Sequence, residues 1–225
     1  MDNKELNTVF EKSFPFWNIL SQSDRDYICN SSSAVSYPKS TNIHSDSDCG
    51  GVFFVKKGCL RLYILSEDGK EITLYRLFPG DMCMLAASCV IQSITFDVFV
   101  DAEEPSDCLI IAGNAFASVS ERVPEMKIFA LEMAVSRFSD VMWVMQQILF
   151  MSFDRRLAIF LLDESVNIGS DTIKLTHEQI AKYMGSAREV VSRMLKYFSS
   201  EGIVESSRSN GIKILDKKRL RELAH

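Results

Sequence analysis

Residues 175–196 constrain the fold of this chain most strongly, because their pattern is typical of two short helices joined at a glycine. Thr176 and Gln179 have the spacing of a capping box, in which the N-cap hydroxyl accepts the N3 amide and the N3 side chain bonds back to the cap. Gly185 follows the first helix and can adopt the left-handed conformation that a tight reversal requires. The sequence therefore predicts a helix-turn-helix.

The second helix of this motif is expected to be amphipathic. Ser186 and Glu189 repeat the capping-box spacing and predict its start. Its apolar residues share one face: Val190, Val191, Met194, Leu195 and Phe198. Its polar residues, at i, i+3, i+4 and i+7, share the other: Glu189, Ser192, Arg193 and Lys196. The polar face can enter a major groove while the apolar face packs. The structural alternative is a helical hairpin whose polar face is only solvated.

A β-hairpin is predicted after the second helix. Residues 203–205 and 212–214 read as short strands, and Asn210-Gly211 between them is a type I′ turn signal. A recognition helix followed by a hairpin is a winged helix. The sequence therefore predicts that the hairpin is the wing of the helix-turn-helix.

Charge is distributed unevenly along the chain. The whole chain has 25 basic and 30 acidic residues, a formal net charge of −5. Residues 176–225 contain ten Lys or Arg and six Asp or Glu, a net charge of +4, which leaves −9 for residues 1–175. A basic C-terminal part attracts phosphates, whereas the acidic part is not expected to contact nucleic acid.

The 225 residues, 47% of them hydrophobic, are enough for two domains with cores of their own. No run approaches the ~18 apolar residues of a membrane span, and the first residues lack the apolar region of a signal peptide, so we expect a cytoplasmic protein with no membrane partner. The cysteines include no Cys-x-x-Cys pair and predict neither a disulfide framework nor a zinc finger: Cys29, Cys49, Cys59, Cys83, Cys89 and Cys108.

Residues 36–112 read as short strands separated by turn residues, including Val52–Val55, Cys59–Leu65 and Glu71–Tyr75. Residues 94–102 and 108–112 continue the pattern. Such strands predict a barrel or a roll, and a generic antiparallel β-domain without a ligand is the alternative.

A long helix is predicted from Pro124 to Phe150. Apolar residues follow a strict 3-4 spacing over three heptads, which is the pattern of a coiled-coil seam: Ile128, Leu131, Val135, Phe138, Met142, Met145 and Leu149. Val141, Val144 and Ile148 widen the stripe. The sequence predicts a homodimer helix, and a helix buried wholly within its own chain is the alternative.

The order of β-roll, long helix and winged helix-turn-helix resembles the Crp/Fnr family of bacterial transcription regulators over nearly the whole chain. Val55-Lys-Lys-Gly58, residues 67–71 and Leu77-Phe-Pro-Gly-Asp81 are similar to the glycine turns of the family's cyclic-nucleotide-binding-type domain. The pattern from Thr176 to Leu195 is close to the family's helix-turn-helix, and it is the more specific of the two.

The resemblance implies an α+β fold: an N-terminal double-stranded, jelly-roll-like β-roll at 1–123, a dimerisation helix at 124–150 and a winged helix-turn-helix at 151–225. It implies a transcription regulator rather than an enzyme. The expected partners are an inverted repeat in double-stranded DNA with a TGA-like core in each half, a second copy of the chain, and RNA polymerase.

By position, Glu189 and Arg193 match the family's base-reading residues, and Arg188 and Ser192 match positions that some members use. Arg can bond guanine bidentately and Glu can accept from cytosine N4, although Glu189 could also cap its helix and pair with Arg193. Backbone contacts, which fix register without reading sequence, are expected from Lys182, Lys196 and Arg208. Thr176 completes the expected set of DNA-binding residues.

The ligand region departs from the family's cyclic-nucleotide pattern. Residues 82–90 lack the Gly-Glu pair, and Phe96-Asp97 stands where Arg-Ser or Arg-Thr would fall. No Lys, Arg or His lies between Arg76 and Arg122, whereas acidic residues are frequent there. Because a phosphate needs cationic partners, we expect no binding of cyclic AMP.

The effector and any cofactor are not identified by sequence. Residues 1–28 contain no cysteine for an iron–sulfur cluster of the kind held by the family's oxygen sensors. Cys83 and Cys89 could form a redox pair or part of a metal site, and buried unreactive thiols are the alternative. A haem would depend on His44, because His177 lies in the helix-turn-helix and His225 ends the sequence.

Two other classes of function stay open. One is an effector-binding adaptor whose helix-turn-helix docks protein instead of DNA. The other is an enzyme housed in the β-roll, although the sequence has no Ser-His-Asp arrangement, phosphate loop or His-rich metal set. Salt-dependent binding to duplex DNA separates these classes, because phosphate contacts release counterions.

Overall fold

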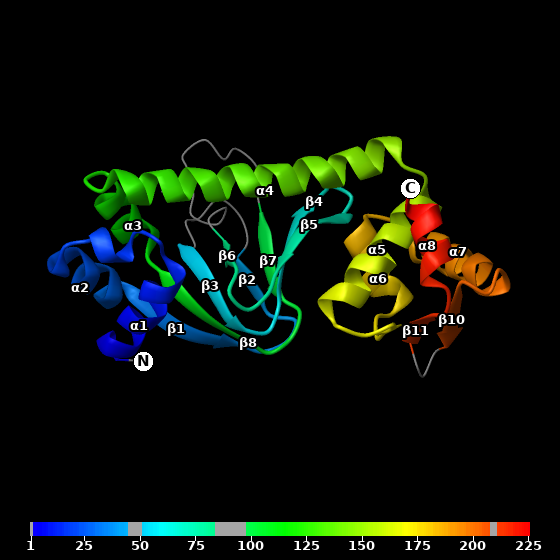
Figure 1. The fold of residues 1–225 in the computed structure, drawn as a ribbon, viewed down its shortest axis with the longest axis horizontal. Coiled ribbons are helices and arrows are strands. Elements are labelled where there is room, and N and C mark those ends of the chain that lie inside the picture. Colours follow the sequence, from blue (N-terminus) through cyan, green and yellow to red (C-terminus); the bar gives the residue numbers. More distant parts are fainter. Residues whose placement is uncertain (1, 45–50, 84–97, 208–210) are drawn as a thin grey trace. The chain divides into compact units, whose positions relative to one another are not determined.

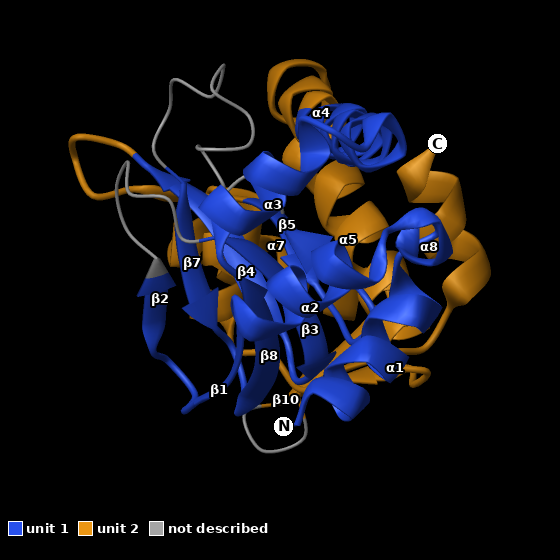
Figure 2. Ribbon diagram, turned by 90° about the vertical axis from the view of Figure 1, so that its left-hand side faces the viewer, with its two compact units in different colours: residues 1–65, 74–141 blue, residues 66–73, 142–225 orange. Residues whose placement is uncertain are grey.

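The computed structural model describes residues 2–44, 51–83, 98–207 and 211–225. The chain divides into two compact units, the first formed by residues 1–65 and 74–141 and the second by residues 66–73 and 142–225 (Figure 2). Each unit has its own apolar core. Within the described ranges, no helix is both long and apolar enough to cross a membrane.

Within the described residues, two four-stranded sheets, with strand orders β1-β8-β3-β6 and β2-β7-β4-β5, form the roll that the strand pattern predicts. The pairs β1–β8, β3–β8, β3–β6, β2–β7 and β4–β7 are antiparallel. The strands are β1 (Ser32–Tyr37), β2 (Asn42–His44), β3 (Val52–Lys57), β4 (Leu60–Leu65), β5 (Glu71–Leu77), β6 (Met82–Cys83), β7 (Phe99–Ala102) and β8 (Ser106–Ile111).

Strand β3 shows why its sequence is an uninterrupted apolar run. Val52 and Phe54 belong to the core that includes the N-terminal helices, whereas Phe53 and Val55 belong to the core that includes residues of both sheets. Successive side chains of a strand point to opposite faces, so a strand covered on both faces has no polar alternation. The residues that the sequence shows as one run therefore join two separate cores.

Helices that the sequence analysis did not predict cover one sheet. They are α1 (Asn3–Ser13), the 3-10 helix η1 (Trp17–Ile19), α2 (Gln22–Asn30) and α3 (Gly113–Ser120). Figure 1 shows α1, α2 and α3 gathered at one end of the first unit. Phe10, Trp17 and Phe116 are fully buried there. Burial of each of these large side chains contributes about 1.5–3 kcal/mol, which holds the helices on the sheet.

The long helix α4 has the predicted bounds, Pro124–Phe150 (Figure 1). Met126 and Ala130 are buried against the core of the first unit. The seven seam residues, in contrast, are 43–65% exposed in the single chain: Ile128, Leu131, Val135, Phe138, Met142, Met145 and Leu149. The alternative of a helix buried wholly within its own chain is therefore wrong.

The second unit contains a winged helix-turn-helix. Its elements are α5 (Phe153–Asn167), β9 (Thr172–Ile173), α6 (His177–Met184), α7 (Arg188–Ser200), β10 (Val204–Ser207), β11 (Gly211–Ile214) and α8 (Lys217–Ala224). Strands β10 and β11 pair antiparallel, which confirms the predicted hairpin. The short strand β9, which was not predicted, adds to β11 and makes a three-stranded sheet.

Candidate nucleic-acid interface

Helix α6 begins with the predicted capping box. The amide of Gln179 donates to Oγ1 of Thr176 at 3.1 Å, and the amide of Thr176 donates to Oε1 of Gln179 at 2.9 Å. These two bonds satisfy donors that a helix N-terminus leaves without intrahelical partners. The Thr176 side chain is exposed, so its capping bond leaves it accessible to solvent.

The turn after α6 has the left-handed glycine that the sequence predicts. Gly185 has φ +58°, and its amide donates to the carbonyl of Lys182 at 3.4 Å. The amide of Ser186 donates to the carbonyl of Ala181 at 2.9 Å. These bonds form a Schellman motif, which satisfies the last carbonyls of α6.

The prediction of a second capping box, formed by Ser186 and Glu189, is wrong. The N-cap of α7 is Ala187, which has no side-chain hydrogen bond, and Glu189 is the second helical residue instead of the third. The physical reason is that Ser186 still belongs to the end of α6, where its amide closes the Schellman motif. Helix α7 therefore starts one residue later than the spacing of Ser186 and Glu189 indicates.

The core of the second unit fixes the orientation of α7. Val191, Leu195 and Phe198 are fully buried, in one cluster with residues of α5, α6 and the hairpin. Arg156 of α5 also donates from Nη2 to the carbonyl of Met184, at the end of α6. The shared apolar core and this polar bond from α5 together hold the two helices of the motif in a defined arrangement.

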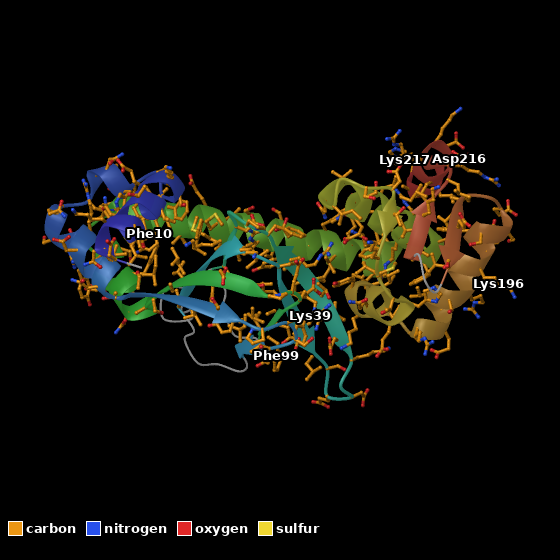
Figure 3. All side chains as sticks on the ribbon, turned by 90° about the horizontal axis from the view of Figure 1, so that it is seen from below. Phe10, Lys39, Phe99, Lys196, Asp216 and Lys217 are labelled. Atoms are coloured by element: carbon orange, nitrogen blue, oxygen red, sulfur yellow. The ribbon has the colours of Figure 1, made fainter. Side chains whose placement is uncertain are left out.

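The opposite face of α7 is open to solvent. Arg188, Glu189, Arg193 and Lys196 are exposed, and Ser192 is half-buried. Figure 3 shows Lys196 on the outer side of α7. Within the described part of the chain, no ion pair joins Glu189 to Arg193, in keeping with the small stabilisation that exposed pairs give. Both side chains are thus available to a ligand.

His177 contacts this face, a role that the sequence analysis missed. Its Nδ1 lies 2.7 Å from Oγ of Ser192, and its Nε2 lies 3.5 Å from Oγ of Ser206 on β10. Burial lowers the pKa of His177, and the positive charge of Arg188 lowers it further. The ring is therefore neutral at pH 7, because even the ordinary histidine pKa is about 6.5.

Of the expected phosphate contacts, Lys182 already has a partner within the protein. Lys182 is about half exposed, and its Nζ lies 3.2 Å from Oε1 of Glu71, in the segment 66–73 that belongs to the second unit. In the absence of DNA, the ammonium group of Lys182 therefore forms an ion pair with the carboxylate of Glu71. Arg208 lies outside the described residues.

In the first unit, α4 places a cation, Arg137, next to the roll. The search for basic residues between Arg76 and Arg122 could not find it, because Arg137 lies further along the chain. The guanidinium carbon of Arg137 lies 4.8 Å from the ring centroid of Tyr75. Its nitrogens lie 3.8 Å from Oδ1 of Asp81 and 3.0 Å from Oδ2 of Asp140. This cation is thus already paired with two carboxylates and stacked on an aromatic ring.

The described cysteines of the roll are buried thiols. Cys83 is fully buried, with its Sγ 3.9 Å from Oη of Tyr75. Burial raises the pKa of Cys108 to about 11, so this thiol is protonated at pH 7. Cys89, the second cysteine of the redox pair considered above, and the side chain of His44, the histidine considered for haem, lie outside the described residues. Among the residues that are described, no cluster of three His, Cys, Asp or Glu side chains could hold a metal ion.

Comparison with known proteins gives matches for both units. The family model of the Crp-like helix-turn-helix domain matches residues 155–223. The model of the cyclic nucleotide-binding domain matches residues 34–122. The two models thus cover the helix-turn-helix and the roll separately.

Individual relatives extend over most of the chain. A solved structure from Eubacterium rectale, described as a regulator of the Crp/Fnr family, is 44% identical, with a TM-score of 0.89, and covers 95% of this chain and 99% of that chain. The cAMP-activated global transcriptional regulator CRP of Pasteurella multocida is 24% identical over 177 residues, 76% of this chain and 84% of its own length. The transcriptional activator protein Anr of Pseudomonas aeruginosa is 25% identical over 183 residues, 78% of this chain and 73% of its own.

Proposed function

Since the chain belongs to the Crp/Fnr family of transcription regulators, we propose that it binds a specific DNA sequence and responds to an effector or redox signal other than cyclic AMP. The observation that carries the proposal is the exposed polar face of α7 on a helix whose other face is anchored in the core by the buried side chains of Val191, Leu195 and Phe198. A rigidly held helix with free polar side chains fits the major groove. The protein then acts in the cytoplasm, where it meets DNA and RNA polymerase.

The division of roles on α7 follows from side-chain chemistry. Arg193 and Arg188 can each bond guanine O6 and N7 bidentately, and Glu189 can accept from cytosine N4. The absence of an ion pair between Glu189 and Arg193 in the described residues supports these roles, because neither group has to leave a protein partner. Ser192 faces the same groove and can bond either kind of base edge.

Backbone contacts come from residues around the reading face. Lys196, one turn after Arg193, reaches the phosphates where the helix leaves the bases. Lys182, Thr176 and Arg208 complete the set. The net charge of +4 over residues 176–225 supports this assignment, since phosphate neutralisation supplies most of the sequence-independent affinity.

A second copy of the chain covers the seam of α4. Seven apolar side chains at 3-4 spacing are 43–65% exposed in the single chain, and such a stripe on a long helix is the seam of a two-stranded coiled coil. The proposal that cyclic AMP is not the effector is supported by charge: the sequence has no cation between Arg76 and Arg122, and Arg137 is paired with Asp81 and Asp140. A phosphate there would meet carboxylates first.

The test compares Arg193→Ala, Lys196→Ala and a matched control, Arg221→Ala, in which an exposed arginine of α8 is removed. Each protein is titrated at several salt concentrations with a duplex selected from a random library and with a scrambled duplex. Arg193→Ala should lose about 1–3 kcal/mol of discrimination and relax preference at one base pair of each half-site. Lys196→Ala should weaken both duplexes equally and make the salt dependence shallower.

The outcomes separate the classes of function. If Arg193→Ala lowered the affinity for both duplexes equally, α7 would be a nonspecific or protein-docking face, as in an adaptor. If no variant differed from Arg221→Ala, the nucleic-acid interface itself would be wrong, and the roll would be the place to look for activity. Addition of cyclic AMP should leave all affinities unchanged.

A further inference from the structure

His177 joins three elements of the second unit through one ring. It is the first residue of α6, its Nδ1 lies 2.7 Å from Oγ of Ser192 on α7, and its Nε2 lies 3.5 Å from Oγ of Ser206 on β10. The ring is half-buried between these elements. The short contact is thus made to a residue of the reading face, and the long one to the first strand of the hairpin.

We propose that His177 is a positioning residue that sets whether the Ser192 hydroxyl donates or accepts a hydrogen bond at the base edge. The inference rests on the proposed function, in which Ser192 faces the major groove. A hydroxyl has one proton and two lone pairs. Whatever it gives to the histidine ring it cannot give to a base.

The two protonation states of Nδ1 of His177 give the Ser192 hydroxyl two different base preferences. When Nδ1 carries no proton, Ser192 donates to the ring and offers only lone pairs to DNA, which suits the amino groups of adenine or cytosine. When Nδ1 carries a proton, Ser192 accepts from the ring, and its own proton is free for guanine O6 or thymine O4. In the proposed neutral state the ring carries its proton on Nε2, 3.5 Å from the exposed hydroxyl of Ser206, which can accept it.

Protonation converts the first state into the second, because both ring nitrogens of a charged histidine are donors. The pKa of His177 is lowered by burial and by Arg188, so the neutral state prevails at pH 7 and the charged state is reached on acidification. Around the ring, α7 presents Arg188 and Ser192, and β10 presents the uncharged Ser206. The acidic residues next to His177 and Ser206 in sequence are both exposed: Glu178 and Glu205.

The experiment measures base preference as a function of pH. Full-length protein is titrated with duplexes that carry the selected operator, with each base pair of one half-site varied in turn, between about pH 8 and about pH 5. At one position the ratio of dissociation constants for amino-bearing over carbonyl-bearing bases should shift by about three- to tenfold, the value of one hydrogen bond. The preference should move from A or C towards G or T as the pH falls.

Variants assign the effect to the two side chains. Ser192→Ala removes the hydroxyl and should abolish the preference and its pH dependence at that position only. His177→Asn keeps a hydrogen-bonding group near the position of Nδ1 but cannot titrate, so it should bind the operator with a preference that is flat in pH. His225→Asn is the matched control, since it removes another histidine of the same unit and should leave the shift intact.

The inference is overturned if the wild-type preference is flat in pH, or if the shift persists in Ser192→Ala or in His177→Asn. Thermal unfolding checks each variant, and if His177→Asn does not fold, the comparison of wild type with Ser192→Ala decides. Failure of this inference can be distinguished from failure of the proposed function. If Arg193→Ala relaxes specificity while the pH arm is flat, only the role of His177 is wrong; if the selected duplex is never preferred over the scrambled one, the function is.

Discussion

At the scale of single residues, Asp24 illustrates how one buried carboxylate ties the helices of the first unit together. It is 9% exposed, and its Oδ2 accepts from Oγ of Ser21 at 2.7 Å. Its Oδ1 accepts from Nε of Arg122 at 3.0 Å, so α2 is bonded to the chain after α3. The bond from Ser21, followed by that from Arg122, lowers the pKa of Asp24 below its ordinary value.

A lowered pKa in the folded state predicts acid sensitivity. Asp24→Asn should lower the free energy of unfolding by about 1–2 kcal/mol at neutral pH, since charge-assisted bonds are lost. The contribution is complete above the unfolded pKa, about 3.9, and is lost as the pH falls through the lower folded pKa. Denaturant unfolding at several pH values should therefore show the two proteins converging in acid. Asp26→Asn, which removes an exposed carboxylate of α2, should match the wild type throughout, and a difference that persisted in acid would contradict this account.

Three residues of the helix-turn-helix show which contacts sequence spacing can predict and which it cannot. The spacing of Thr176 and Gln179 is a local signal, and the capping box it predicts is present. Ser186 and Glu189 have the same spacing but form no capping box. The left-handed conformation of Gly185 lets the amide of Ser186 bond to the end of α6 instead. The contact of His177 with Ser192 has no signal in spacing, since it depends on how α6 and α7 cross.

At the scale of elements, α4 makes the sharpest prediction, because its exposed stripe needs a cover. Phe138→Glu combined with Met142→Glu places two charges in a seam that should bury both residues, at a cost of several kcal/mol per unpaired buried charge. Sedimentation should show monomers, and operator binding should be lost. Ile19→Glu, an equivalent change at a site that is 60% exposed in η1, should stay dimeric. A dimer that survived the double change would show that α4 is not the interface.

Elements differ in how far their sequence predicts them. The 27-residue helix α4 repeats its pattern often enough for its bounds to be read directly. The N-terminal helices are not predicted from the sequence, because they are held by tertiary contacts. Phe10 and Trp17 are buried in one core with residues of strands far along the chain. Strand β9 has two residues and exists because β11 pairs with it. Arg137 likewise meets Tyr75 only through the packing of α4 on the roll.

At the scale of the whole molecule, two copies joined along α4 would be related by a two-fold axis, and the symmetry of the protein should appear in its DNA. Two symmetry-related recognition helices, one α7 from each copy, would then read the same base pairs on opposite strands. An inverted repeat is thus expected, with half-sites about one helical turn, ~34 Å, from centre to centre. By resemblance to the family, each half should contain a TGA-like core.

Selection from random duplexes tests the symmetry and the reading residues together. The full-length protein should enrich an inverted repeat, and changing the spacing by about half a helical turn should weaken binding strongly, because the second half-site then faces away from its helix. Under the same selection, Arg193→Ala should give a repeat with one degenerate position in each half, at the same place in both. Enrichment of single half-sites, or degeneracy in one half alone, would contradict a symmetric dimer, since each copy must lose the same contact.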